Sequence, residues 1–192
     1  MTSRFAEALA RTRARLAEAL ARSQARPAEA LARRRVALGF ACAAIALWLA
    51  KPTPRSLVLG ATIASIGELL RIWAAGHLEK GREVTMSGPY RFSRHPLYVG
   101  SSLIGVGIAI ASASLVVALL TALYLAATLA AAIATEEKHL TEKFGQAYPE
   151  YRDGRAPDAS RRFTVDRAMR NREYRAVCGL AVALALLALK LL

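Results

Sequence analysis

Five apolar segments divide residues 36–192, and short polar stretches separate them. The segments cover residues 36–50, 56–78, 97–111, 115–135 and 175–192. A helix needs about 20 apolar residues to cross a bilayer, and the second and fourth segments reach that length. The remaining polar residues are too few to cover so many apolar segments in a soluble globule. The pattern therefore predicts an all-α integral membrane bundle of about five transmembrane helices.

The connections between the segments predict how the helices follow one another. Residues 51–55 contain two prolines and are predicted to form a turn, because proline cannot continue a helix. Only residues 112–114 separate the third segment from the fourth, which predicts an antiparallel helical hairpin. The third segment also contains three glycines that permit close helix packing, namely Gly100, Gly105 and Gly107.

Residues 1–35 contain a repeat of eleven residues, rich in alanine, leucine, arginine and glutamate. Eleven residues make almost three whole helical turns, so the apolar residues of successive copies share one helix face. Two interpretations stay open: an amphipathic helix lying on an anionic leaflet, or a solvated basic extension. We therefore expect a basic helical extension over residues 1–35 and a membrane-embedded domain over residues 36–192.

The net charge of +13 is concentrated outside the apolar segments. Residues 1–35, 80–96 and 136–175 carry 23 of the 27 lysines and arginines, whereas the opposite loops have only Lys51 and Arg55. Basic loops favour the cytoplasmic side, so we expect a multi-pass protein of a bacterial inner membrane with its N-terminus in the cytoplasm. Anionic membrane lipids suit these charges. No motif presents the arginines to a groove, so nucleic acid is not an expected partner.

The residue types that hold metals are sparse in this chain. Cys42 and Cys178 stand singly in apolar segments, without the spacing of a metal site. The histidines are His77, His95 and His139, too few and too scattered for the histidine boxes of a di-iron oxygenase. No metal is therefore expected.

A polar stretch comes directly before the third apolar segment and overlaps its first residues. We call residues 88–98 the first polar cluster. Pro96 suits the first turn of a helix, whose start leaves backbone N–H groups unpaired beside Arg94 and His95. Such a position suits a carboxylate or a phosphate. Two aromatic side chains of the cluster can stack on a flat ring or donate hydrogen bonds, Tyr90 and Tyr98. The alternative is that the cluster only anchors the chain at the membrane boundary.

Glu136 and Glu137, the second polar cluster, end the fourth apolar segment. Adjacent like charges resist burial unless a cation or a donor compensates them, as a ligand's ammonium or ribose hydroxyls would. The alternative is a pair of solvated carboxylates just outside the lipid. The predicted hairpin brings both clusters to one side of the bilayer. We predict an active site there, with Arg94, His95 and Glu136 as catalytic residues.

Two features flank the predicted site. Glu68 and Arg71 are three residues apart and can pair on one helix face, either for function or as a self-satisfied pair near the interface. Three aromatic residues after the fourth segment are interpreted as a belt at the membrane interface; they are Phe144, Tyr148 and Tyr151.

Three stretches of sequence carry a joint pattern: LRIWAAGH at 70–77, SGPY with RHPLYVG within 87–100, and EEKHL with FG and Y within 136–148. Together they resemble the isoprenylcysteine carboxyl methyltransferase family in its short bacterial form, and the related phospholipid methyltransferases, over about residues 56–157. The resemblance implies a membrane enzyme that binds S-adenosylmethionine in a cytoplasmic pocket. The implied cofactor contacts are Tyr90, His95, Pro96, Leu97, Tyr98 and Glu136, with Glu137 added by the charge argument and residues 82–85 as further candidates.

The resemblance implies methyl transfer to an isoprenoid or lipid-like acceptor, with a carboxylate as one candidate acceptor group. Ala132 stands where the eukaryotic prenylcysteine enzymes carry a substrate-contacting arginine, so the acceptor differs from theirs or is held differently. Two alternatives stay open: a membrane sterol-type reductase that uses NADPH, and a non-catalytic membrane anchor that binds anionic lipid.

Overall fold

The computed structural model describes residue 37 and residues 39–155 and 161–192, so the predicted repeat of residues 1–35 lies outside the described residues. The first described helix is Gly39–Leu49. The elements that follow are α2 (Pro54–Ala75), η1 (Gly88–Arg91), α3 (Pro96–Ser112), α4 (Leu115–Phe144), α5 (Ala147–Arg152), α6 (Val165–Arg170) and α7 (Tyr174–Leu189). The described residues contain no strand. The all-α prediction is confirmed.

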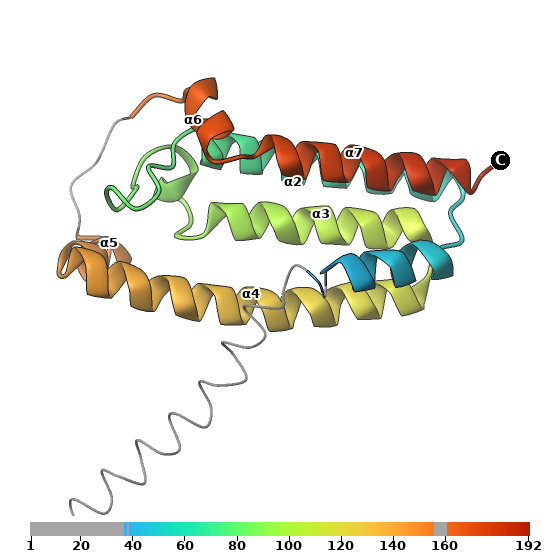
Figure 1. Ribbon diagram of the computed structural model, residues 1–192, viewed down its shortest axis with the longest axis horizontal. Helices are drawn as coiled ribbons and strands as arrows, with labels where there is room; N and C mark the ends of the chain where they lie inside the picture. The colour runs from blue at the N-terminus through green and yellow to red at the C-terminus, as the bar shows by residue number, and fades with distance from the viewer. Residues whose placement is uncertain (1–36, 38, 156–160) are drawn as a thin grey trace, which may run out of the picture.

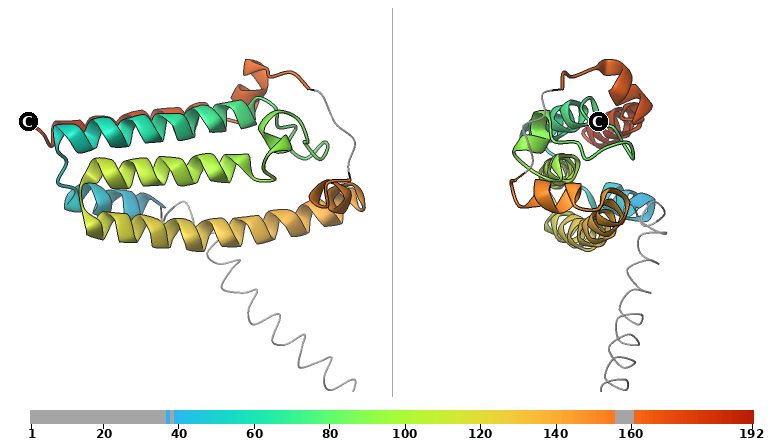
Figure 2. Two further views of the ribbon diagram at one scale, coloured as in Figure 1. Left: turned by 180° about the vertical axis from the view of Figure 1, so that it is seen from behind. Right: turned by 90° about the vertical axis from the view of Figure 1, so that its left-hand side faces the viewer.

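The long helices lie roughly parallel and antiparallel in one bundle (Figure 1). The helix α3 lies between the pair α2 and α7 on one side and α4 on the other, as the end-on view of Figure 2 also shows. The connections after α2 and after α4 meet at one end of the bundle, together with α5 and α6. We call this the polar end, because both predicted polar clusters lie there.

Glycines set the close packing of α2 against α3. A Cβ on Gly67 would lie 2.7 Å from the Gly100 carbonyl oxygen, and a Cβ on Gly107 would lie 2.5 Å from the Gly60 carbonyl oxygen. Only a residue without a Cβ permits this backbone approach, as in the small-residue contacts of other membrane helices. The packing expected of Gly100 and Gly107 is confirmed, and Gly105 packs against Leu125 of α4.

The predicted turn at residues 51–55 is wrong in its second half, because Pro54 already belongs to α2. Thr53 caps this helix: its hydroxyl accepts a hydrogen bond from the Ser56 backbone N–H, and the Ser56 side chain accepts one from Thr53. Proline suits a first helical turn, since no intrahelical partner awaits its missing N–H. The chain therefore turns before Pro54.

The predicted hairpin is present, with Ala113 in the left-handed conformation (φ 46°) between α3 and α4. The fourth apolar segment is longer as a helix than predicted, because α4 continues from Thr135 to Phe144. The added residues are good helix formers with charged side chains, so the apolar run ends there while the helix does not. With 30 residues α4 is about 45 Å long, which exceeds the hydrocarbon core of about 30 Å.

The bundle has the surface of a membrane protein. Two of its helices, α2 and α4, are long and apolar enough to cross a bilayer, and three shorter apolar helices accompany them. Large apolar side chains such as Leu119 and Leu123 are exposed, 63% and 70% respectively, which suits a surface that faces lipid. We therefore describe the chain as an α-helical membrane bundle.

Candidate functional site

The two polar clusters meet at the polar end of the bundle. The His95 ring nitrogen Nε2 lies 3.1 Å from Glu137 Oε1, and the Tyr98 hydroxyl donates a 2.6 Å hydrogen bond to Glu136 Oε2. Residues about 40 positions apart in the chain thus become direct partners, as expected for an antiparallel hairpin. The prediction that the clusters share one side is confirmed.

Local geometry fixes the first polar cluster. Gly88 has φ 60° and packs against the His77 ring, where any Cβ would collide, so glycine is required at this turn. Pro96 opens α3 as predicted, and His95 stands at its N-cap without a side-chain capping bond. The His95 and Tyr98 rings stack with their centroids 5.6 Å apart. Pro96 has no N–H, and the Tyr98 and Val99 N–H groups donate to the His95 carbonyl oxygen, so among the described residues the Leu97 N–H is the free donor at this helix start.

Arg94 and His95 both face Glu137. Arg94 Nη1 lies 3.4 Å from Glu137 Oε1, the same oxygen that His95 contacts, and the Arg94 side chain is 44% exposed. The Glu137 carboxylate thus balances the charge of Arg94 and orients the His95 imidazole. The exposed Arg94 side chain lies at the solvent edge of the site. Two further predicted cofactor contacts lie in the first turn of α3, where Pro96 is buried and Leu97 is half-buried.

The helix α5 folds back onto this site. Gly145, in a positive-φ conformation (54°), ends α4, and Tyr151 then donates a 2.6 Å hydrogen bond to the Tyr90 carbonyl oxygen. Tyr148 is buried, at 2% exposure. Burial raises the pKa of both phenols to about 12, and in Tyr148 the neighbouring Glu137 carboxylate adds to the effect. The interpretation of Tyr148 as an interfacial belt residue is wrong, because it packs inside the protein.

Tyr90 marks a place in the site where a further polar group would fit. Its side chain is 7% exposed, and its hydroxyl has no hydrogen-bond partner in the described part of the chain. Burial, together with the Glu136 carboxylate, raises the pKa of this phenol far above its usual range. An unsatisfied buried hydroxyl costs about 1–3 kcal/mol, so its place beside Glu136 marks a position for an additional polar group.

Arg71 connects this site to the C-terminal helix. Its Nε donates a 2.7 Å hydrogen bond to Glu173 Oε1, while Glu68 Oε2 lies 3.9 Å away. The predicted pair of Glu68 and Arg71 is therefore a weak contact, and Glu173 is the main partner. Both carboxylate oxygens of Glu68 are buried without a hydrogen bond from the described residues. Nothing in the sequence pattern around Glu173 distinguishes it from the other charges near α7, so sequence reasoning missed it.

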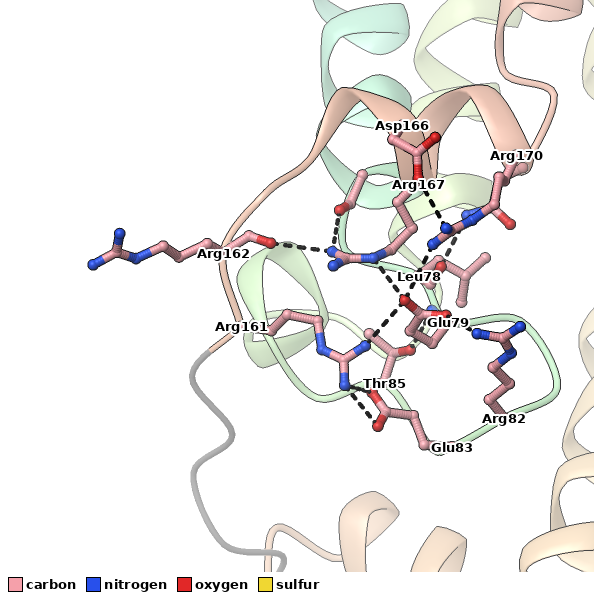
Figure 3. A network of polar contacts seen from close by, with 12 residues as sticks. Leu78, Glu79, Arg82, Glu83, Thr85, Arg161, Arg162, Asp166, Arg167 and Arg170 are labelled. Atoms are coloured by element: carbon pink, nitrogen blue, oxygen red, sulfur yellow. Dashed lines mark hydrogen bonds and ion pairs between the residues drawn. The ribbon is translucent and has the colours of Figure 1, made fainter.

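The loop candidates, residues 82–85, belong to a separate network around Glu79 (Figure 3). Arg167 donates a 2.8 Å hydrogen bond to Glu79, and the Thr85 hydroxyl accepts one from the Glu79 backbone. Desolvation opposes ionisation of Glu79, but the Arg167 hydrogen bond and nearby arginines outweigh it and lower its pKa. Arg161 also pairs with Glu83 at 2.7 Å. This network ties α6 to the loop after α2 and thereby supports the polar end.

A cavity of about 470 Å³ opens beside the site, and Glu137, Tyr148 and Arg152 are among its lining residues. No group of three or more histidine, cysteine or acidic side chains among the described residues is arranged to hold a metal ion. The chemical resources of the site are therefore carboxylates, phenols, an imidazole, an arginine and the Leu97 N–H at the start of α3.

The phospholipid methyltransferase family matches residues 34–147, which include both polar clusters and the hairpin between them. The chain belongs to this family, and the resemblance predicted from the sequence is confirmed.

Two curated relatives are similar to the same region. The cobalt-zinc-cadmium resistance protein CzcN of Cupriavidus metallidurans is 35% identical over 96 residues, which are 49% of this chain and 41% of the relative. The nickel-cobalt-cadmium resistance protein NccN of Alcaligenes xylosoxydans xylosoxydans is 35% identical over 98 residues, 50% of this chain and 43% of the relative. The matched residues thus span less than half the length of these relatives. No solved structure matches the chain.

Proposed function

We propose that the protein is an S-adenosylmethionine-dependent methyltransferase that acts on an isoprenoid or lipid-like acceptor at the membrane. One observation carries the proposal: the Tyr90 hydroxyl is buried without a hydrogen-bond partner among the described residues, within electrostatic reach of Glu136 and Tyr98, which are hydrogen-bonded to each other. Family membership supplies the reaction class, since the family is that of the phospholipid methyltransferases.

The residues at the polar end suit the parts of this cofactor. Glu136 can accept hydrogen bonds from ribose hydroxyls or from the ammonium group, and the Tyr90 hydroxyl would gain a partner. The free Leu97 N–H at the start of α3 suits the carboxylate of the methionine part. When bound, S-adenosylmethionine supplies an electrophilic methyl group on a sulfonium ion. We assign cofactor contacts to Tyr90, His95, Pro96, Leu97, Tyr98, Glu136 and Glu137.

The chain's own contribution to catalysis is positioning and exclusion of water. Glu137 holds the His95 imidazole by a 3.1 Å contact, and the stacked Tyr98 ring limits its rotation. Arg94, at the solvent edge, is placed to orient an oxygen-bearing acceptor group. A carboxylate acceptor is already nucleophilic and needs no general base, whereas an amine acceptor would lose a proton, for which His95 is the nearest candidate.

The charge distribution supports the cytoplasmic location of the site in a bacterial inner membrane. Residues 80–96 and 136–175 are rich in arginine and lysine, and the described residues of both stretches lie at the polar end. A water-soluble cofactor would enter from this side, while a lipid-phase acceptor would enter between helices. Anionic lipids are the expected neighbours of the basic loops.

Calorimetry on the detergent-purified protein tests the proposal. We expect binding of S-adenosylmethionine, weakened about tenfold or more by His95→Ala or Glu136→Ala, because each removes a charge-assisted contact worth about 1.5–3 kcal/mol. His139→Ala is the matched control, since this exposed histidine lies on the same stretch of α4 and forms no hydrogen bond or ion pair with either cluster among the described residues. Binding of NADPH instead would favour the reductase. Unchanged binding by both site variants would refute the assignment of the site.

A further inference from the structure

A second cavity, of about 330 Å³, lies between α3 and α7 and is separate from the cavity beside Glu137. Ile104 and Ile108 line it from α3, and Ala176, Gly179, Leu180 and Ala183 line it from α7. Arg71 and Ser101 complete the lining at the end that is nearer to the polar clusters. The cavity is thus apolar along its length and polar at one end, and we call it the α3–α7 groove.

The groove follows the helix axes. Ser101 and Ile108 are seven residues apart on α3, and Ala176 and Ala183 are seven apart on α7, so each wall extends about 10 Å. Gly179 lines the groove beside open space, since a Cβ built there would meet nothing within 4 Å. An elongated apolar groove parallel to membrane helices fits an extended hydrocarbon chain better than a flat ring.

Arg71 has donors left for a ligand at the polar end of the groove. Its Nε donates to Glu173, and its Nη1 donates to the Ser101 hydroxyl at 2.5 Å and the Leu97 carbonyl oxygen at 3.4 Å. Its Nη2 has no hydrogen-bond partner among the residues that the structure describes. A guanidinium carries five N–H donors, so the two on Nη2 remain available.

The charges around Arg71 determine which kind of oxygen can accept hydrogen bonds from these donors. Glu173 lies 2.7 Å and Glu68 3.9 Å from the guanidinium, so two carboxylates already surround one cation. A further anion would gain little here, because Glu173 already neutralises the guanidinium. A neutral carbonyl or ester oxygen accepts the same hydrogen bonds and has no charge to be balanced.

The groove is connected to the proposed methyl-transfer site by the first turn of α3. Leu97 and Ser101, which contact Arg71, flank Tyr98, which contacts Glu136. A ligand head group at Arg71 would therefore lie about one helical turn from the polar clusters.

We propose that the α3–α7 groove binds the hydrocarbon tail of the lipid-like acceptor, and that Arg71 Nη2 donates to a neutral carbonyl or ester oxygen near its head. This inference rests on the proposed function only where it calls the bound lipid the methyl acceptor. Whether the groove binds lipid at all has its own test. The groove differs from the rest of the bundle surface in that two helices line it and an arginine lies at one end.

The test is photo-crosslinking of the full chain in vesicles of phosphatidylcholine that carries a diazirine in one acyl chain. Labelled residues are mapped by mass spectrometry. We expect labelling of residues 176–183 on the groove side and of residues 104–108. Gly179→Leu should reduce the groove labelling about tenfold, because the new side chain occupies the space of several methylenes. Val182→Leu on the same helix, at a 58% exposed position, is the matched control.

Binding and transfer measurements on the same variants separate the two proposals. Gly179→Leu should bind S-adenosylmethionine as the unchanged protein does, yet transfer about tenfold less labelled methyl group to a membrane lipid extract. Gly179→Ala, which fills less of the groove, replaces it if the leucine variant does not purify as a single species. Groove labelling that Gly179→Leu leaves unchanged would overturn the groove proposal. Groove labelling without any binding of S-adenosylmethionine would overturn the proposed function and leave the lipid site standing.

Discussion

Tyr151 donates a 2.6 Å hydrogen bond from its hydroxyl to the backbone carbonyl oxygen of Tyr90, across 61 positions of sequence. This bond holds α5 against the first polar cluster. Because Tyr90 carries a buried hydroxyl without a partner among the described residues, the bond also fixes the backbone from which that hydroxyl projects. The short helix after α4 is therefore part of the wall of the site.

Tyr151→Phe removes this bond and little else, since the ring remains. We expect S-adenosylmethionine to bind about fivefold more weakly, which corresponds to the loss of one hydrogen bond worth about 1 kcal/mol. Calorimetry measures the change. Tyr174→Phe, at a 43% exposed position on α7, is the control and should bind normally. Equal affinities for the two variants would mean that α5 does not shape the site.

Glu173→Ala should destabilise the protein. The substitution leaves the Arg71 guanidinium without its 2.7 Å partner in a largely buried position, where Arg71 is 20% and Glu173 8% exposed. Removing one member of such a pair costs about 3 kcal/mol, or roughly 6–12 °C in the unfolding midpoint of a protein this size. Thermal unfolding in detergent measures it, with the exposed Glu150→Ala as the control. A shift no larger than that of the control would show that Glu68 or water replaces Glu173.

Much of the fold was predictable because apolar length and turn residues are local signals. The hairpin followed from three residues, 112–114, and the entry of α3 followed from Pro96. The meeting of the two polar clusters then followed from the antiparallel direction of two helices, although the pairing of His95 with Glu137 rather than Glu136 did not. These predictions required only the directions of the helices, which the apolar segments and their short connections reveal.

The features that were missed depend on contacts between distant segments. Glu173 pairs with Arg71 across 102 positions, and no periodicity distinguishes it from its charged neighbours. Tyr148 was assigned to the interface because aromatic residues after a membrane helix often lie there. Tyr148 is buried instead, because the turn at Gly145 returns the chain to the bundle. Likewise, the end of an apolar run did not reveal the end of α4, since charged residues also form helices.

Gly107→Ala and Gly179→Ala form a matched pair that tests the packing of α2 against α3. A Cβ on Gly107 would lie 2.5 Å from the Gly60 carbonyl oxygen, so the helices must separate, at a cost of about 1–3 kcal/mol. A Cβ on Gly179 meets nothing within 4 Å, and alanine favours the helix by up to about 1 kcal/mol. Thermal unfolding should therefore show a lower midpoint for the first variant and an equal or higher midpoint for the second. The opposite order would show that the contact between α2 and α3 is looser than described.

Alkaline pH should destabilise the polar end through Tyr148. Burial raises its pKa from the usual value near 10 to about 12, so the folded state keeps the phenolic proton that the unfolded state loses above pH 10. The stabilising contribution is complete below pH 10 and is lost as the pH rises through 12, because the unfolded state binds fewer protons in this window. Tyr148→Phe cannot titrate, so its unfolding midpoint should fall less between pH 9 and pH 11 than that of the unchanged protein. Tyr174→Phe should keep the full pH dependence. Identical slopes for all three proteins would place the alkaline sensitivity elsewhere in the chain.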